Sequence, residues 1–261
     1  MSLDFELLLV VLTVVTGVVW GWDKWRQRRA GGQPLPVDDA SPIELAWWID
    51  LGRSLFPVIL AVLVIRSFLF EPFRIPSGSM IPTLYNGDFI LVNKFSYGLR
   101  LPVLHKEIID FGEPKRGDVV VFRYPLDTSQ DYIKRVIGVP GDHIVYRDKR
   151  LYVNGEPIRQ MDLGRYTGPE QEPDALLKRE WLNDVVHPIV INAASPDRDF
   201  EYEVPPGNYF VMGDNRDRSS DSRFWGPGPA GNMGGPALLV WVSRDSEGFG
   251  VNWTRIGKKI R

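Results

Sequence analysis

The sequence predicts a mainly β extracytoplasmic domain with a loop-rich insertion, anchored by two N-terminal transmembrane α-helices. Three observations predict this fold class. Two long apolar runs lie within the first 70 residues, and short β-like runs separated by turns begin at Asp88. Beyond Asp88 no comparable series of long amphipathic helices follows, so the domain is built from strand pairing rather than from βαβ units.

The first apolar run, residues 3–22, predicts a transmembrane helix over residues 1–22. A helix rises about 1.5 Å per residue, so the run is about 30 Å long and matches the hydrocarbon core of a bilayer. The alternative is a cleaved secretory signal. Asp4 and Glu6 stand where such a signal has its basic leader, and no small-residue cleavage site follows, so we favour the span.

The second apolar run predicts a transmembrane helix over residues 51–70, with a cytoplasmic loop at 23–50 between the spans. Basic residues follow the first run: Lys24, Arg26, Arg28 and Arg29. Because positive residues stay in the cytoplasm, residues 71–261 are expected on the outer side. The alternative is a buried helix of a soluble domain, because the uninterrupted part of the run, residues 55–65, is short.

Eight short runs predict the strands of the outer domain. They are residues 89–92, 119–123, 132–137, 143–146, 151–153, 200–204, 209–212 and 238–242. Asn154-Gly155 after one of them predicts a two-residue hairpin. Within residues 150–205, the stretch from about 160 to 199 is rich in Pro, Asp and Glu and poorly periodic, which predicts the loop-rich insertion.

Composition excludes several kinds of chemistry. The 261 residues carry 31 Lys and Arg against 33 Asp and Glu, so no global field favours nucleic acid as a partner. The chain contains no cysteine, which excludes disulfides, a thiolate nucleophile and zinc sites of the cysteine type. The histidines, His105, His143 and His187, show no metal-ligand spacing, and we expect each in a turn or on the surface. No metal or cofactor is predicted.

Two serines lie between prolines in the segment PSGSMIPTL, residues 76–84, just beyond the second apolar run. Pro76 and Pro82 restrict the backbone on both sides, and Gly78 permits a close approach that a side chain would forbid. A turn of this kind can hold a hydroxyl rigidly at the membrane surface. The alternative is a linker, which a segment rich in Pro, Gly and Ser also predicts.

Lys134 lies inside an apolar, strand-like run, DYIKRVIG. Side chains alternate along a strand, so Tyr132, Lys134 and Val136 share a face. Burial there disfavours the ammonium, lowers the pKa of the lysine and leaves an amine that can accept a proton from a serine hydroxyl. The alternatives are a solvated lysine on the face opposite a buried Arg135, or one paired with Asp131.

A third segment, GDNRDRSSDSRFWG at residues 213–226, follows a predicted strand and ends in two bulky aromatic residues. The aromatic residues indicate that the loop packs against the domain, where its charges need partners. Arg223 is expected to pair with Asp221 or with the nearby Asp217.

Together these segments resemble the bacterial type I signal peptidases, the membrane-bound leader peptidases with a Ser-Lys dyad. The resemblance covers the second span and most of the outer domain. It rests on four ordered blocks: residues 76–84, GDFILV at 87–92, RGD at 116–118 continuing through 132–142, and residues 213–226. Each block alone is weakly diagnostic, whereas the ordered set is highly specific.

The resemblance implies a role for four polar residues. Ser79 would be the nucleophile and Lys134 its general base. Ser219 would hold the lysine amine in position, and the Ser77 hydroxyl with the Ser79 backbone N–H would form the oxyanion hole. The residue types suit these roles, because a weak nucleophile needs an adjacent base and developing negative charge needs preset donors. The implied reaction is hydrolysis of a preprotein just after its signal peptide, through a serine acyl-enzyme.

Further expectations follow from the same resemblance. Asp221 and Arg223 would be a structural ion pair that supports the Ser219 loop. The implied substrate-binding residues are apolar: Phe73, Ile75, Met80, Leu84, Tyr132 and Ile133. The implied partners are preproteins bearing signal peptides and the phospholipid bilayer, and the translocation machinery is a further partner that the resemblance allows. The implied location is the bacterial inner membrane, as a multi-pass protein with its catalytic domain on the periplasmic side.

A hypothesis of a different class is a membrane-tethered β module, related to signal peptidases, that binds partners without catalysis. It predicts a missing serine or lysine, and both Ser79 and Lys134 are present. Two features depart from the family pattern. Arg218 occupies a position where many relatives carry a smaller polar residue, and residues 226–236 are unusually rich in Gly and Pro. These departures concern local loop geometry rather than the dyad.

Overall fold

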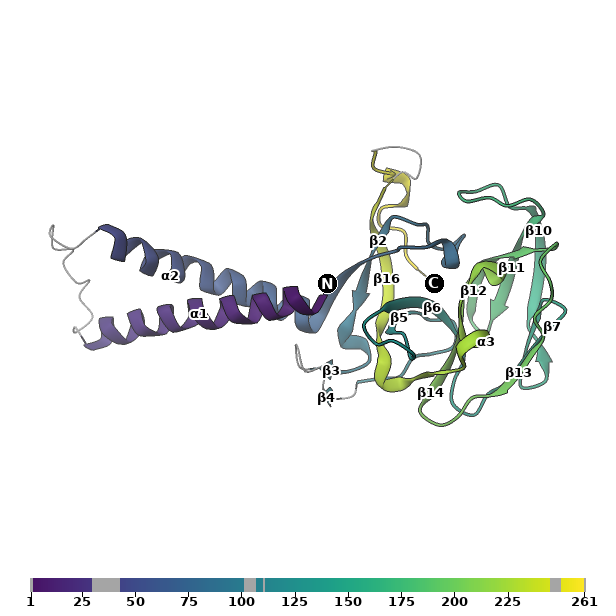
Figure 1. Cartoon of the computed structure of the whole chain (residues 1–261), viewed down its shortest axis with the longest axis horizontal. Helices are drawn as coiled ribbons and strands as arrows, with labels where there is room; N and C mark the ends of the chain where they lie inside the picture. Colours follow the sequence, from purple (N-terminus) through teal and green to yellow (C-terminus); the bar gives the residue numbers. More distant parts are fainter. Residues whose placement is uncertain (1, 30–42, 101–106, 110, 245–249, 261) are drawn as a thin grey trace. The chain divides into compact units, whose positions relative to one another are not determined.

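The computed structural model describes residues 2–29, 43–100, 107–109, 111–244 and 250–260. The chain forms two compact units, which Figure 1 traces from purple to yellow. The first unit comprises residues 1–70 and 99–109, and the second comprises residues 71–98 and 110–261.

The first unit is mainly helical. It contains α1 (Ser2–Arg29), α2 (Ile43–Val64) and a π-helical turn, η1 (Ile65–Leu69), with a two-stranded sheet of β3 (Leu99–Arg100) and β4 (Glu107–Ile109). Helix α1 continues beyond the predicted residues 1–22, because Lys and Arg are also good helix formers. Helix α2 begins before the predicted residue 51 and ends at Val64, and the π-helical turn and β1 take up the rest of the predicted second span. The central part of the predicted 23–50 loop lies outside the described residues, as does His105.

Glycines let the two helices approach closely. A Cβ on Gly17 would lie 2.9 Å from the ring of Phe56, and a Cβ on Gly52 would lie 2.6 Å from Cγ1 of Val19. Arg53 on α2 also pairs with Asp23 on α1 at 3.3 Å. The helices therefore form a packed antiparallel pair rather than two separate rods.

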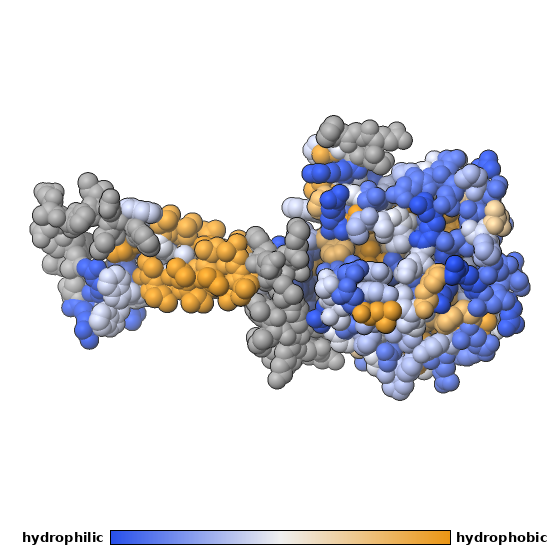
Figure 2. All heavy atoms as spheres, in the orientation of Figure 1, coloured by the Kyte–Doolittle hydropathy of each residue, from blue (hydrophilic) through white to orange (hydrophobic). Residues whose placement is uncertain are grey.

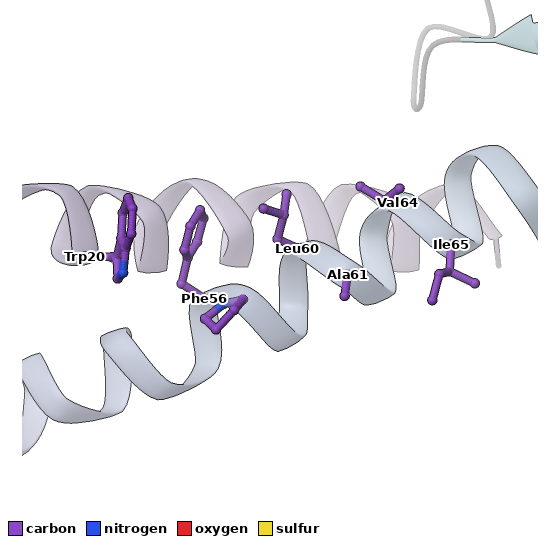
Figure 3. Close-up of a pocket in the computed structure, with 7 residues that line it drawn as sticks. Trp20, Phe56, Leu60, Ala61, Val64 and Ile65 are labelled. Carbon is purple, nitrogen blue, oxygen red and sulfur yellow. The ribbon is translucent and has the colours of Figure 1, made fainter.

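The outer surface of this helix pair is apolar. Figure 2 shows the apolar residues gathered over α1 and α2, whereas the face shown of the β unit is mostly polar. A groove of about 460 Å³ runs along the pair and is lined by apolar residues, six of them labelled in Figure 3: Trp20, Phe56, Pro57, Leu60, Ala61, Val64 and Ile65. Within the described residues, Leu7–Arg26 forms a helix long and apolar enough to cross a membrane.

The second unit is mainly β, as predicted. Its largest sheet has the strand order β1-β2-β16-β5-β6-β14-β15. The strands are β1 (Phe70–Arg74), β2 (Asp88–Asn93), β5 (Val119–Arg123), β6 (Asp131–Gly138), β14 (Asn208–Met212), β15 (Gly228–Pro229) and β16 (Met233–Ser243). Strand β16 pairs antiparallel with β2 and β5, and β6 pairs antiparallel with β5 and β14.

A four-stranded sheet contains the predicted hairpin. Its order is β13-β7-β8-β9, from β7 (His143–Arg147), β8 (Arg150–Val153), β9 (Glu156–Pro157) and β13 (Phe200–Glu203). Asn154 and Gly155 join β8 to β9 with φ angles of 54° and 82°. Two consecutive positive φ values are what a tight type I′ turn requires, so the hairpin prediction is confirmed.

The prediction of a loop-rich insertion is wrong. The region instead contains a three-stranded antiparallel sheet of β10 (Arg159–Arg165), β11 (Ala175–Leu182) and β12 (Val185–Asn192). Charged residues interrupt the apolar pattern of β11, and Pro188 stands inside β12. Proline has no N–H to donate to a neighbouring strand. It is tolerated in β12 because β12 is an edge strand of this sheet and pairs within it on one side only.

Short helical turns complete the unit, and the first of them contains Ser79 of the serine segment. They are η2 (Gly78–Met80), η3 (Lys94–Ser96), η4 (Arg216–Arg218), α3 (Ser222–Trp225), η5 (Ala230–Asn232) and η6 (Trp253–Arg255). The side chains of Met80 and Leu84 join an apolar core cluster with Ile90 and Val240 from β2 and β16. Burial of this kind contributes about 25 cal/mol per Å² of apolar surface, and it fixes the turn to the sheet.

Candidate active site

The serine segment is a packed turn and not a linker. Turn η2 is flanked by extended backbone, at Ser77 with φ −148° and ψ 162° and at Ile81 with φ −60° and ψ 136°. Ser79 is 7% exposed, and Met80 and Leu84 are fully buried. The hydroxyl of Ser79 is therefore held by the apolar side chains that follow it.

The segment that begins at Gly213 packs directly on this turn. The Asn215 N–H donates to the Ser79 carbonyl at 3.1 Å, and the Asn215 Nδ2 donates to the Gly78 carbonyl at 3.1 Å. A Cβ on Gly213 would lie 2.5 Å from the Ser79 carbonyl oxygen and 2.3 Å from Ser219 Oγ. This close approach requires glycine at position 213.

Lys134 places its amine against the hydroxyl of Ser79. Nζ lies 2.8 Å from Ser79 Oγ and donates to the Ile133 carbonyl at 2.9 Å. It also lies 5.5 Å from the centre of the Tyr132 ring, as expected for residues on one face of β6. Lys134 is 4% exposed and Arg135 is fully buried, so the alternative of a solvated lysine is wrong.

Burial lowers the pKa of Lys134 from 10.5 to about 8. The cause is desolvation, because an ammonium loses its hydration in the interior. The negative charges of Asp221 and Asp214 act in the opposite direction and offset part of this effect. An amine with such a pKa can be neutral at physiological pH, which a general base requires.

A buried ion pair joins the lysine strand to the serine segment. Arg135 donates through Nε and Nη2 to the two carboxylate oxygens of Asp214 at 2.8 and 2.7 Å, and through Nη1 to the Gly117 carbonyl at 2.7 Å. The Thr83 hydroxyl donates to the same carboxylate. Burial raises the pKa of Asp214, but the Arg135 charge and these hydrogen bonds outweigh burial and hold the pKa below its usual range. Asp214 thus holds three of the four predicted blocks together.

A second buried cluster lies beside Asp214 and was missed by sequence reasoning. His187, on β12, is 1% exposed, so its expected place in a turn or on the surface is wrong. Its Nε2 lies 3.4 Å from Glu180 and 3.8 Å from Asp214, and Glu180 is also paired with Arg216. Burial lowers the pKa of His187, so the ring is neutral at pH 7. The apolar run around His187 in β12 was the available signal.

The other predicted polar residues differ in their hydrogen bonds. Ser77 Oγ lies 3.4 Å from Ser79 Oγ. Ser219 Oγ is buried beside Gly213 and has no hydrogen-bond partner among the described residues. Asp221 accepts from Arg223 Nε and Nη2 at 2.8 Å each, and from the Gly213 N–H at 3.0 Å. The ion pair therefore fixes both ends of the loop that carries Ser219.

The six predicted lining residues divide between two apolar clusters. Tyr132 packs against the cluster that contains Val120 and Phe122. The other five share the core cluster next to Ser79: Ile75, Met80, Leu84 and Ile133, with Phe73 packed against them. These five residues, which we call the apolar wall, belong to the core on which the serine turn packs.

The arrangement has the parts of a serine hydrolase. A hydroxyl lies within hydrogen-bond distance of a desolvated amine, and a second hydroxyl stands beside it. A nucleophile, an adjacent base and a donor for developing negative charge suit acyl transfer. No group of three or more metal-ligating side chains occurs within the described residues.

Comparison with known proteins identifies the family. Residues 48–242 match the family described as Signal peptidase, peptidase S26. The chain is 47% identical to the Signal peptidase I of Pseudomonas fluorescens and 44% identical to that of Pseudomonas aeruginosa, with 93% of each chain covered in both cases. It is 34% identical to the Signal peptidase I of Haemophilus influenzae, covering 93% of this chain and 87% of that one. The chain belongs to the signal peptidase family, peptidase S26.

A solved structure is also similar in sequence. The crystal structure of a signal peptidase I from Enterococcus faecalis matches 48% of this chain and 97% of its own, at 28% identity with a TM-score of 0.32. The resemblance drawn from the four sequence blocks is confirmed by the family match. The chain is accordingly a serine endopeptidase that cleaves signal peptides, and the family match favours this activity over the non-catalytic binding module.

Proposed function

We propose that Ser79 is the nucleophile and Lys134 the general base of signal-peptide cleavage. The observation that carries this proposal is the 2.8 Å contact between Lys134 Nζ and Ser79 Oγ in a buried site. When the amine is neutral, the hydroxyl donates to it. Lys134 then takes the proton of Ser79 as Oγ attacks the scissile carbonyl of the preprotein.

The proton then moves onward through the same amine. The Lys134 ammonium gives its proton to the leaving nitrogen of the mature chain, and the signal peptide remains bound to Ser79 as an ester. Neutral Lys134 next takes a proton from the water that attacks the ester. As the bond from the acyl carbon to Ser79 Oγ breaks, the Lys134 ammonium returns this proton to Oγ and the signal peptide is released. The Ser79 N–H and the Ser77 hydroxyl stabilise the oxyanion in both halves, a role supported by the 3.4 Å separation of the two serine hydroxyls.

The surrounding residues position these groups. Ser219, buried without a hydrogen-bond partner among the described residues, is available to orient the lysine amine once substrate has displaced solvent. The ion pair of Asp221 with Arg223 supports the Ser219 loop. The apolar wall formed by Phe73, Ile75, Met80, Leu84 and Ile133, together with Tyr132, accepts the small residues before the cut.

The membrane arrangement is part of the proposal. The predicted spans, residues 1–22 and 51–70, cross the bacterial inner membrane, residues 23–50 face the cytoplasm, and the catalytic domain of residues 71–261 lies in the periplasm. The apolar window Leu7–Arg26 supports the first crossing. Cations stack on tryptophans where α1 becomes basic, as at an interface: Lys24 on Trp20, Arg26 on Trp22 and Arg29 on Trp25.

This arrangement fits the substrate. The apolar part of a signal peptide lies in the bilayer, and its cleavage site emerges at the outer face. An enzyme held in the same bilayer meets preproteins at the correct depth, and the translocation machinery that delivers them is a further partner. The chain has no cysteine, so a single cysteine at the exposed Leu126 reports its side. Labelling by an impermeant thiol reagent from the periplasm is expected, and labelling from the cytoplasmic side alone would overturn the topology.

Cleavage of a purified preprotein in detergent tests the dyad. Ser79→Ala and Lys134→Ala are each expected to lose at least about a thousandfold in kcat, as loss of a nucleophile or its base does elsewhere. Ser129→Ala and Lys115→Ala, at exposed positions, are the matched controls and should cleave at the wild-type rate. A wild-type rate for either dyad variant would refute the assignment.

A further inference from the structure

A cluster of charged side chains lies against the serine turn and has no part in the dyad. Glu170 lies in the loop between β10 and β11. A Cβ on Gly78 would lie 2.4 Å from Glu170 Oε2, so the carboxylate packs directly against the glycine between the two serines. Any side chain at position 78 would displace this carboxylate.

Arg218 connects this loop to the Ser219 segment. Its Nε lies 3.1 Å from Glu172 Oε1, and its Nη1 lies 3.8 Å from Glu170 Oε2. Glu172 is held in turn by Asn192, whose Nδ2 donates to Oε2 at 3.0 Å. We call Glu170, Glu172 and Arg218 the Glu170 cluster. Arg218 is also the residue that departs from the family pattern in this segment.

The Glu170 cluster is accessible to a bound peptide and has a net charge. Its side chains are 30%, 33% and 44% exposed for Glu170, Glu172 and Arg218. Two carboxylates and one guanidinium sum to one negative charge. The apolar wall beside Ser79, which contains Met80 and Ile133, has no such charge. The serine turn is therefore in contact with two chemically different groups of side chains, the apolar core residues and the Glu170 cluster.

We propose that Glu170 and Arg218 set the charge preference of the enzyme for the first residue of the mature chain. This inference rests on the proposed function. In this proposal a peptide with its scissile carbonyl at Ser79 has its signal-peptide side on the apolar wall, and its mature side passes the Glu170 carboxylate that packs against the neighbouring Gly78. Opposite charges attract, so the carboxylate of Glu170 favours a basic residue after the cut over an acidic one. Arg218 offsets part of this preference.

The test uses three preproteins that differ only in the first mature residue, which is Lys, Gln or Glu. The measured quantity is kcat/KM for each substrate with the full-length enzyme in detergent. Wild type is expected to prefer Lys to Glu by about two- to fivefold, the range for partly exposed charge pairs. Glu170→Gln should lower this ratio toward one, whereas Arg218→Gln should raise it by a similar factor. Asp174→Asn, in the same loop, is the matched control and should leave the ratio unchanged.

The opposite signs separate a specificity role from a structural one. A loosened loop would lower kcat/KM for all three substrates equally and leave the ratio unchanged. Equal ratios in wild type and Glu170→Gln, or changes of the same sign in both variants, would overturn the proposal. The Gln substrate separates this proposal from the proposed function. If Ser79→Ala still cleaved the Gln substrate, the dyad would be refuted, whatever the charge preference of the enzyme.

Discussion

The burial of Lys134 predicts how cleavage depends on pH. An ammonium cannot accept the proton of Ser79, so only the neutral fraction of Lys134 is active. With the pKa of Lys134 at about 8, roughly one tenth of the enzyme is active at pH 7 and roughly one hundredth at pH 6. The logarithm of kcat/KM should therefore rise with a slope of one and level off above pH 8.

The assay is cleavage of a preprotein whose own groups do not titrate between pH 6 and 9. Because His187 is a buried titratable group whose pKa lies below the usual histidine range, it could produce another limb at lower pH; His187→Gln serves as a control and should retain the limb near pH 8. A profile that stays flat down to pH 5 would refute a lysine base. A limb near the unperturbed value of about 10.4 would refute its desolvation.

Three further predictions concern stability and packing. Because the pKa of Lys134 lies below its unfolded value, its burial opposes folding by about 3 kcal/mol at pH 7, a cost that disappears as the pH rises from 8 to 10.5. Lys134→Met should therefore raise the melting temperature at pH 7 although it is inactive, and an unchanged or lower value would contradict this. Gly213→Ala should reduce kcat at least about a hundredfold through its clash with Ser79 and Ser219, and cleavage at the wild-type rate would show that the approach is not tight. Asp214→Ala leaves Arg135 buried without its partner and should lower the free energy of unfolding by about 3–5 kcal/mol. A melting temperature equal to that of the wild type would disprove this prediction.

Most of the fold was predictable wherever the alternation of apolar residues is regular. Strand β5 was predicted with both its ends, because Val and Phe dominate it, and β6 was predicted within one residue of each end, because Tyr, Ile and Val recur along it. Strands β10, β11 and β12 were not predicted. The charged residues of β10 and β11 pair with one another across the sheet, as Lys178 does with Asp162 at 3.0 Å, and β12 contains a proline, so these strands have a composition typical of loops.

The candidate site was predictable only in part for a similar reason. Local sequence placed Lys134 on an inward face and Ser79 in a restrained turn. Their contact joins a turn and a strand whose residues, Ser79 and Lys134, are 55 positions apart in the sequence, and only the resemblance to a family brought them together. The buried contacts of Asp214 with Arg135 and Thr83 were not predicted, because side-chain pairing across such distances leaves no periodic signal.

The central claim, that Ser79 attacks the substrate with help from Lys134, is tested most directly by Ser79→Cys. The chain contains no other cysteine, so this variant carries a single thiol. The variant is expected to cleave preprotein slowly, and one equivalent of an alkylating reagent should abolish this cleavage. Lys134→Ala in the same background should slow alkylation at pH 7, because the amine stabilises the thiolate. Cleavage that survives complete alkylation of Cys at position 79 would contradict the account.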